Sequence, residues 1–184
     1  MTRKARYVFG VALLAAASLC LLPILQAADT PILDSPEVSE LLSHARSHAN
    51  QLRDDADTMK SFSMSGLTWR SHADQINTIR EHINNLGKVL RDMSDRRHIA
   101  SPWQQTAIDR ITPLAQEMAA NIEKTIEHLN NNQDRLHTPP YRDYLAANYE
   151  VSSSLAKLIN DLVEYGQSKA RYESLGKTLE LPGM

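Results

Sequence analysis

The sequence predicts an all-α protein, an up-down-up-down antiparallel four-helix bundle of long amphipathic helices preceded by a signal peptide. The chain of 184 residues has 6 glycines, 8 prolines and 5% aromatic residues, a composition that favours helices over sheets. Apolar residues recur at spacings of three and four in four separate stretches, which on a helix places them on one face. Capping residues and prolines separate these stretches.

The N-terminal residues 1–27 predict a signal peptide. Arg3, Lys4 and Arg6 precede an uncharged, mostly apolar run over 7–27, and Ala27 is a small residue at a suitable cleavage point ahead of Ala28. We expect cleavage there. The alternative is an uncleaved anchor, because about 20 apolar residues can span a membrane. Both interpretations predict export to the periplasm or the extracellular medium, with membrane contact only through an uncleaved signal segment.

The cysteine content restricts the chemistry of the exported chain. Cys20 is the single cysteine, and it lies inside the expected signal peptide. Leu19 precedes it, whereas acylated bacterial cysteines usually follow a small residue, so lipid attachment is not expected. A processed chain without cysteine has no disulfide, zinc–thiolate site, thiol redox centre or covalently attached haem.

The first helix is expected to follow a linker over residues 28–34. Ser35 is a good N-cap and Pro36 suits the first helical position, where the missing N–H is not needed. Gly66 is expected to end this helix in a left-handed conformation. The helical stripe contains Val38, Leu41 or Leu42, Ala45, His48 or Ala49, Leu52, Ala56, Met59 and Phe62.

The second helix is expected over about 68–97 and has the clearest periodicity in the chain. Its stripe contains Trp69, His72, Ile76, Ile79, Ile83, Leu86, Leu90 and Met93. A helix with one such stripe has a single face to bury against other elements.

Two further helices follow. Ser101 and Gln104 form a capping box at the start of the third helix. Pro113 lies inside that helix on the face opposite its apolar stripe, where it should bend the helix without breaking the periodicity. Pro139 begins a fourth helix that we expect to reach Gly176, followed by a tail over 177–184. The fourth stripe contains Tyr141, Tyr144 or Leu145, Asn148, Val151, Leu155, Leu158, Leu162, Tyr165 and Tyr172.

Short connections between the helices favour antiparallel neighbours, so residues 35–176 are predicted to form the bundle. The alternative is a splayed pair of helical hairpins that closes only with a second copy, since long amphipathic helices also suit a dimer. His72 and Asn148 interrupt the apolar stripes, and buried polar residues of this kind can fix register or oligomeric state.

The charge balance argues against a nucleic-acid partner. Lys and Arg number 20 and Asp and Glu 22; without the three basic residues of the first six positions, 17 face 22, a net charge of about −5. Phosphates would be repelled by such a chain unless it carried a basic stripe, and the sequence shows none.

Metal and cofactor signatures are sparse. His44 and His48 are four residues apart on one helical face and are weak candidate metal ligands, but two ligands do not make a site. Asp95 with His98 and Asp134 with His137 are three residues apart at helix ends, where the helix dipole sufficiently explains a histidine. No Glu-x-x-His pair of the di-iron bundles occurs. The fourth helix, over 141–176, has no histidine or methionine to ligate a haem. We therefore predict no metal site and no cofactor.

One set of residues suggests a pocket halfway along the bundle. Counting outward from the turns places His48, Gly87, Pro113, Tyr165 and Gly166 at a similar level. Glycine inside a helix costs about 1 kcal/mol relative to alanine, so two at one level suggest close helix approach or space for a ligand. We hypothesise a small polar pocket in which His48 and Tyr165 hydrogen-bond. The alternative is a core histidine packed by small residues.

The sequence contains no serine elbow, no arguable pair of catalytic carboxylates and no glycine-rich phosphate loop. We expect an exported, non-enzymatic helical bundle that acts as an interaction or structural module in the cell envelope and binds another protein or its own copy. The alternative is a periplasmic bundle that binds a small ligand or metal in the pocket around His48 and Tyr165.

Overall fold

The computed structural model describes residues 33–180, which contain four α-helices, a short 3-10 helix and no strand. The helices are α1 (Pro36–Phe62), α2 (Trp69–Asp95), α3 (Pro102–Asn131) and α4 (Pro139–Thr178), with η1 (Arg97–Ile99) between α2 and α3. The prediction of an all-helical bundle is confirmed. The predicted signal peptide, 1–27, and most of the linker, 28–34, lie outside the described residues.

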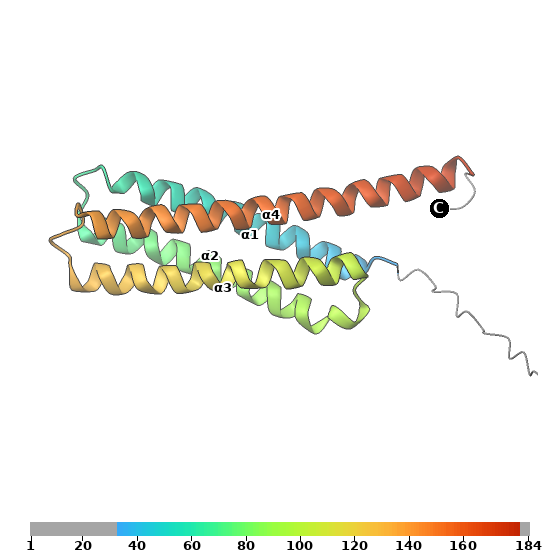
Figure 1. Cartoon of the computed structure of the whole chain (residues 1–184), viewed down its shortest axis with the longest axis horizontal. Coiled ribbons are helices and arrows are strands. Elements are labelled where there is room, and N and C mark those ends of the chain that lie inside the picture. Colours follow the sequence, from blue (N-terminus) through green and yellow to red (C-terminus); the bar gives the residue numbers. More distant parts are fainter. Residues whose placement is uncertain (1–32, 181–184) are drawn as a thin grey trace, which may run out of the picture. The chain divides into compact units, whose positions relative to one another are not determined.

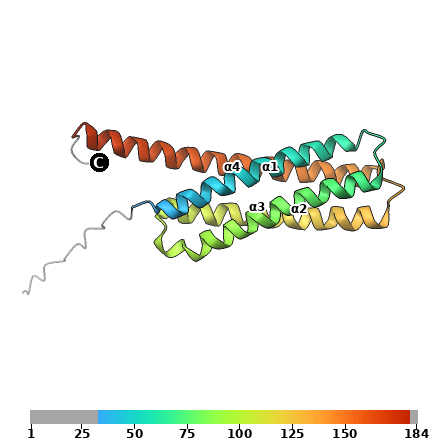
Figure 2. The same ribbon diagram turned by 180° about the vertical axis from the view of Figure 1, so that it is seen from behind.

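The four helices pack around a shared core, as Figures 1 and 2 show from opposite sides. α1 contacts α2 and α4, and α3 contacts the same two helices. No helix in the described region is long and apolar enough to cross a membrane. The largest fully buried side chains come from all four helices: Leu42, Leu52, Met59, Ile76, Ile79, Leu86, Met93, Ile111, Met118, Ile122, Tyr141 and Leu145.

Gln104 joins the starts of α1 and α3. Its buried side-chain carbonyl accepts hydrogen bonds from the backbone N–H of Ser35 at 2.9 Å and of Ser101 at 3.0 Å. Its amide group donates to the carbonyl of Ser35 at 2.9 Å and to the hydroxyl of Ser39 at 3.0 Å. The capping box predicted for Ser101 and Gln104 is present. The same glutamine also holds the N-cap of α1, which the local motif does not reveal.

The end of α1 differs from the expectation. Gly66 does not adopt a left-handed conformation, and a Cβ atom there would meet nothing within 4 Å. The helix ends at Phe62, and the chain leaves it through successive tight turns in which the N–H of Ser63, Met64 and Ser65 each bonds a carbonyl three residues earlier. These turns satisfy the last carbonyls of α1 without a glycine cap.

The buried face of α4 also differs from the predicted stripe. Tyr141, Leu145, Asn148 and Leu155 are buried as predicted, but Ser152 is buried in place of half-buried Val151. Beyond Leu155, Ile159 and Val163 occupy the core, while Leu158 and Leu162 are half-buried and Tyr165 is 52% exposed. Successive residues of a helix are about 100° apart, so a stripe drawn through Leu158 and Leu162 is rotated by about 100° from the buried face through Ile159 and Val163. Because two apolar residues are adjacent at each of these turns, Leu158 with Ile159 and Leu162 with Val163, periodicity alone does not separate the two faces.

α4 is the longest helix and continues past the bundle. Lys169 Nζ lies 3.1 Å from a carboxylate oxygen of Asp34, the residue just before the N-cap of α1. Residues 170–178 therefore extend beyond the start of α1, as the red end of α4 shows in both views (Figures 1 and 2).

Candidate functional site

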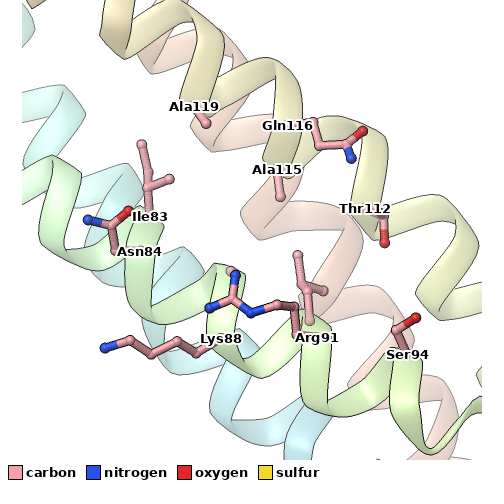
Figure 3. Close-up of a pocket in the computed structure, with 11 residues that line it drawn as sticks. Ile83, Asn84, Lys88, Arg91, Ser94, Thr112, Ala115, Gln116 and Ala119 are labelled. Atoms are coloured by element: carbon pink, nitrogen blue, oxygen red, sulfur yellow. The ribbon is translucent and has the colours of Figure 1, made fainter.

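The clearest site in the described residues is an open groove between α2 and α3, with a volume of about 620 Å³ (Figure 3). Ala115 and Ala119 of α3 face Ile83 and Arg91 of α2 across it. The lining residues are Ile83, Asn84, Gly87, Lys88, Leu90, Arg91 and Ser94 from α2 and Thr112, Ala115, Gln116 and Ala119 from α3.

Small residues open this groove. A Cβ atom at Gly87 would meet only Nη1 of Arg91, at 3.8 Å, so no part of α3 reaches this point of α2. Ala115 and Ala119 present only methyl groups from the other side. Ile83, which the periodicity assigned to the buried stripe, is left half-buried for this reason. The sequence therefore leaves an apolar floor accessible where two larger side chains would have closed the bundle.

The groove carries positive charge. Lys88 and Arg91 line it, and none of its lining residues is acidic. Lys88 donates a hydrogen bond to the amide oxygen of Asn85 at 3.1 Å, and within residues 33–180 neither cation forms an ion pair. Hydroxyl and amide groups of Ser94, Thr112 and Gln116 add polar rims. An apolar floor edged by cations suits a ligand or partner that has an apolar face and negative charge.

The five residues of the hypothesised mid-bundle pocket are not brought together. Gly87 lines the α2–α3 groove, whereas Gly166 lines a separate cavity of about 160 Å³ beside Trp103. Pro113 is exposed, and His48 is half-buried near His82 of α2, with ring centroids 6.3 Å apart.

Tyr165 packs its ring against Trp103, 5.1 Å between centroids, so the hydrogen bond expected between His48 and Tyr165 does not form. The physical reason is rotation about the helix axes. Ala49 takes the inner position beside His48, and Val163 takes the one assigned to Tyr165. Near this level, Asn50 of α1 and Asn160 of α4 exchange side-chain hydrogen bonds of 3.3 and 3.1 Å.

His48 belongs instead to a polar cluster between α1 and α2. His82 Nε2 lies 3.3 Å from a carboxylate oxygen of Asp55, and Asp55 also accepts a hydrogen bond from Gln75. Burial lowers the pKa of His48 below its ordinary value of 6.5, and the neighbouring His82 and His44 lower it further. Sequence reasoning missed His82 and Asp55, because neither lies on a predicted stripe.

The candidate metal ligands do not form a site with a third group. His44 is exposed on α1, and over the described residues no three His, Cys, Asp or Glu side chains are grouped so that they could hold a metal ion.

A second cluster of aromatic rings and histidines lies where the α1–α2 and α3–α4 connections meet. His72 is fully buried, and its Nδ1 is hydrogen-bonded to the hydroxyl of buried Tyr141 at 2.9 Å. Phe62 packs edge-on against His72, and His128 stacks on Tyr141. Burial lowers the pKa of His72, as does the nearby His137, and burial raises the pKa of Tyr141.

Asn148, the other polar residue of the predicted stripes, is also buried and donates to the hydroxyl of Thr125 at 2.8 Å. Both residues that interrupt the apolar pattern therefore make specific hydrogen bonds to another helix.

Comparison with protein-family models, curated protein sequences and solved structures finds no match to this chain.

Proposed function

We propose that this chain is an exported, non-enzymatic helical bundle that acts as an interaction module in the cell envelope, and that the α2–α3 groove is its binding surface. The observation that carries the proposal is the combination, in one open groove, of an apolar floor with Lys88 and Arg91 and no acidic lining residue. The lining offers hydroxyls, amides and cations, but no histidine or carboxylate that would act as a general base.

The partner that suits this groove is an amphipathic helix with acidic residues beside its apolar face. Residues 83–94 extend the groove by about 17 Å along α2 at 1.5 Å per residue, the length of about three helical turns. Helix-in-groove recognition uses an apolar stripe of this length, and charge complementarity at the rim sets orientation and association rate.

We also propose the up-down-up-down antiparallel course for the bundle. Its support is the three short connections, 63–68, 96–101 and 132–138, together with the contacts of His72 with Phe62 and with Tyr141 near two of them. This course puts α2 beside α3 along the full groove.

The groove is tested with anilinonaphthalene sulfonate, an apolar anion whose fluorescence rises on transfer from water to an apolar surface. We expect the folded chain to bind it, and Lys88→Glu with Arg91→Glu to weaken binding by about tenfold or more, equivalent to about 1.4 kcal/mol. The control is Arg53→Glu with Lys157→Glu, which changes the net charge equally on α1 and α4, away from the groove. Equal binding by the two double variants would contradict the proposal.

Export is tested on the chain isolated from its native cells. We expect the envelope or medium fraction to contain a chain with the intact mass of residues 28–184, because the N-terminal segment has the layout of a cleaved signal peptide. A cytoplasmic chain that retains Met1 would contradict an envelope role.

The groove volume supports a second candidate function, which is binding of a small amphipathic anion. About 620 Å³ lies within the range of about 300 to 1,000 Å³ typical of ligand pockets. This candidate predicts that a lipid-like acid is extracted at one equivalent per chain from protein purified without detergent. Mass spectrometry of the extract measures this, and an extract without any such compound would exclude it.

A further inference from the structure

The end of α4 carries an apolar stripe that no described element covers. Tyr172, Leu175 and Leu179 are 60%, 50% and 63% exposed. Tyr172 and Leu175 are three residues apart on one face of α4, and Leu179 is the C-cap that ends the helix. We call these three residues the terminal stripe. Single exposed apolar residues are common on protein surfaces, whereas three within about two turns at one helix end offer a larger apolar surface.

The position of this stripe is fixed by the bundle. The ion pair of Lys169 with Asp34 ties α4 to the start of α1, and Lys169 also lies 2.6 Å from Glu173 one turn further on. The helix beyond Lys169 therefore projects from the bundle as an exposed end (Figures 1 and 2).

We propose that the terminal stripe of one chain docks into the α2–α3 groove of a second copy. This inference rests on the proposed function and names its partner. The chain presents both halves of a helix-in-groove contact, namely an open apolar groove and an unpaired apolar helix end. The stripe spans residues 172–179, about 11 Å along a helix, which fits within the groove's length of about 17 Å.

The charges are complementary. Glu173 lies on α4 between Tyr172 and Leu175, and Glu180 follows the end of the helix with a φ of 51°, while Lys88 and Arg91 edge the groove. Carboxylates that enter the groove beside the stripe would meet cations with no acidic competitor among the lining residues. Such pairs at the rim chiefly fix orientation and raise the association rate.

The contact joins two different surfaces, so it is heterologous and each bound chain still offers a free groove or a free stripe. A helix end of about two turns covers only part of the roughly 800 Å² per partner that a standard interface buries. We therefore expect association that increases with concentration, with a mass in solution that rises above one chain.

The decisive experiment is disulfide capture between two different variants. One chain carries Thr112→Cys in the groove and the other Leu175→Cys in the terminal stripe, both with Cys20→Ser, which removes the single natural cysteine. Mixing them under mild oxidation should give the mixed dimer at least about tenfold faster than a matched control with Thr58→Cys, because docking raises the local thiol concentration. Thr58 is exposed on α1 and, like Thr112, its hydroxyl bonds the carbonyl four residues earlier.

A charge exchange provides the second readout. Lys88→Glu with Arg91→Glu should lower the mass in solution towards one chain, and mixing this variant with a Glu173→Lys and Glu180→Lys chain should restore association. Equal capture rates at Thr112 and Thr58, or a single-chain mass at every concentration, would overturn the inference. Binding of anilinonaphthalene sulfonate distinguishes this inference from the proposed function. If the chain stays monomeric but still binds the sulfonate in the groove, the groove remains the proposed binding surface and only docking of a second copy is excluded.

Discussion

The indole ring of Trp103 occupies the space that a side chain at Gly166 would need. A Cβ atom at Gly166 would lie 2.8 Å from Cη2 and 3.2 Å from Cζ2 of that ring. The ring has little freedom to move away, because its Nε1 donates a hydrogen bond of 2.7 Å to Asp34. Gly166 thus permits close approach of α4 to the start of α3, whereas Gly87 faces open space.

Alanine at these two glycines should therefore have opposite effects. We expect Gly166→Ala to lower the free energy of unfolding by about 1 to 3 kcal/mol through overpacking against Trp103. Gly87→Ala should raise it by up to about 1 kcal/mol, because alanine favours the helix and meets no close neighbour. Urea denaturation of both variants measures the difference. Equal effects of the same sign would contradict the close packing at Gly166 and the open space at Gly87.

Replacement of Gln104 should destabilise the joined starts of α1 and α3. In Gln104→Leu the buried N–H groups of Ser35 and Ser101 lose their acceptor, and each unpaired group costs about 1 to 3 kcal/mol. We expect a loss of about 2 to 4 kcal/mol by chemical denaturation. Gln105→Leu is the matched control, because Gln105 makes one bond, to the carbonyl of Ala100, and should cost about 1 kcal/mol or less. A similar loss of stability in both variants would contradict the role of Gln104 in linking the starts of α1 and α3.

His72 and Tyr141 should be energetically coupled. Either His72→Leu or Tyr141→Phe leaves the other partner of a 2.9 Å buried hydrogen bond unpaired, at a cost of about 1 to 3 kcal/mol. Replacing both removes the polar pair together, so we expect the double variant to lose less than the sum of the single losses. A double-mutant cycle in urea gives the coupling. Strictly additive losses would mean that this bond contributes little.

The stability of the bundle should fall in mild acid. The pKa values of His48 and His72 are lowered, so the unfolded chain binds protons that the folded chain resists. Their contribution is complete above the ordinary value of 6.5 and decreases as the pH falls below it towards the folded-state values. The free energy of unfolding should thus be smaller at about pH 5.5 than at about pH 7.5, and the His72→Leu, Tyr141→Phe double variant should lose less on acidification. Identical pH dependence of the variant would remove His72 as a cause.

The helix starts could be predicted from sequence because the determinants are local. Ser35 with Pro36, and Ser101 with Gln104, identify their own positions in the chain. The orientation of side chains across the bundle was harder. His48 and Ala49 differ by about 100° around α1, and the periodicity of the stripe fits either residue at the core. Only packing against the neighbouring helices selects Ala49.

The groove could be predicted only in part. A glycine inside a helix indicates space or close approach, and Gly87 does line open space. Its partners across the groove, Ala115 and Ala119, are unremarkable in a helix, since alanine is the best helix former. These two alanines leave the groove open only because of the α2 residues that face them. A local sequence pattern does not show which residues of two distant segments face each other.

The central claim, that the α2–α3 groove is the binding surface, is tested most directly by mapping amide chemical shifts. Anilinonaphthalene sulfonate is titrated into the isotope-labelled, processed chain while its backbone amide spectrum is recorded. We predict that the shift changes concentrate at residues 83–94 and 112–119, which line the groove. Changes confined to the terminal stripe or to the face of α1, or a spectrum that does not change, would contradict it.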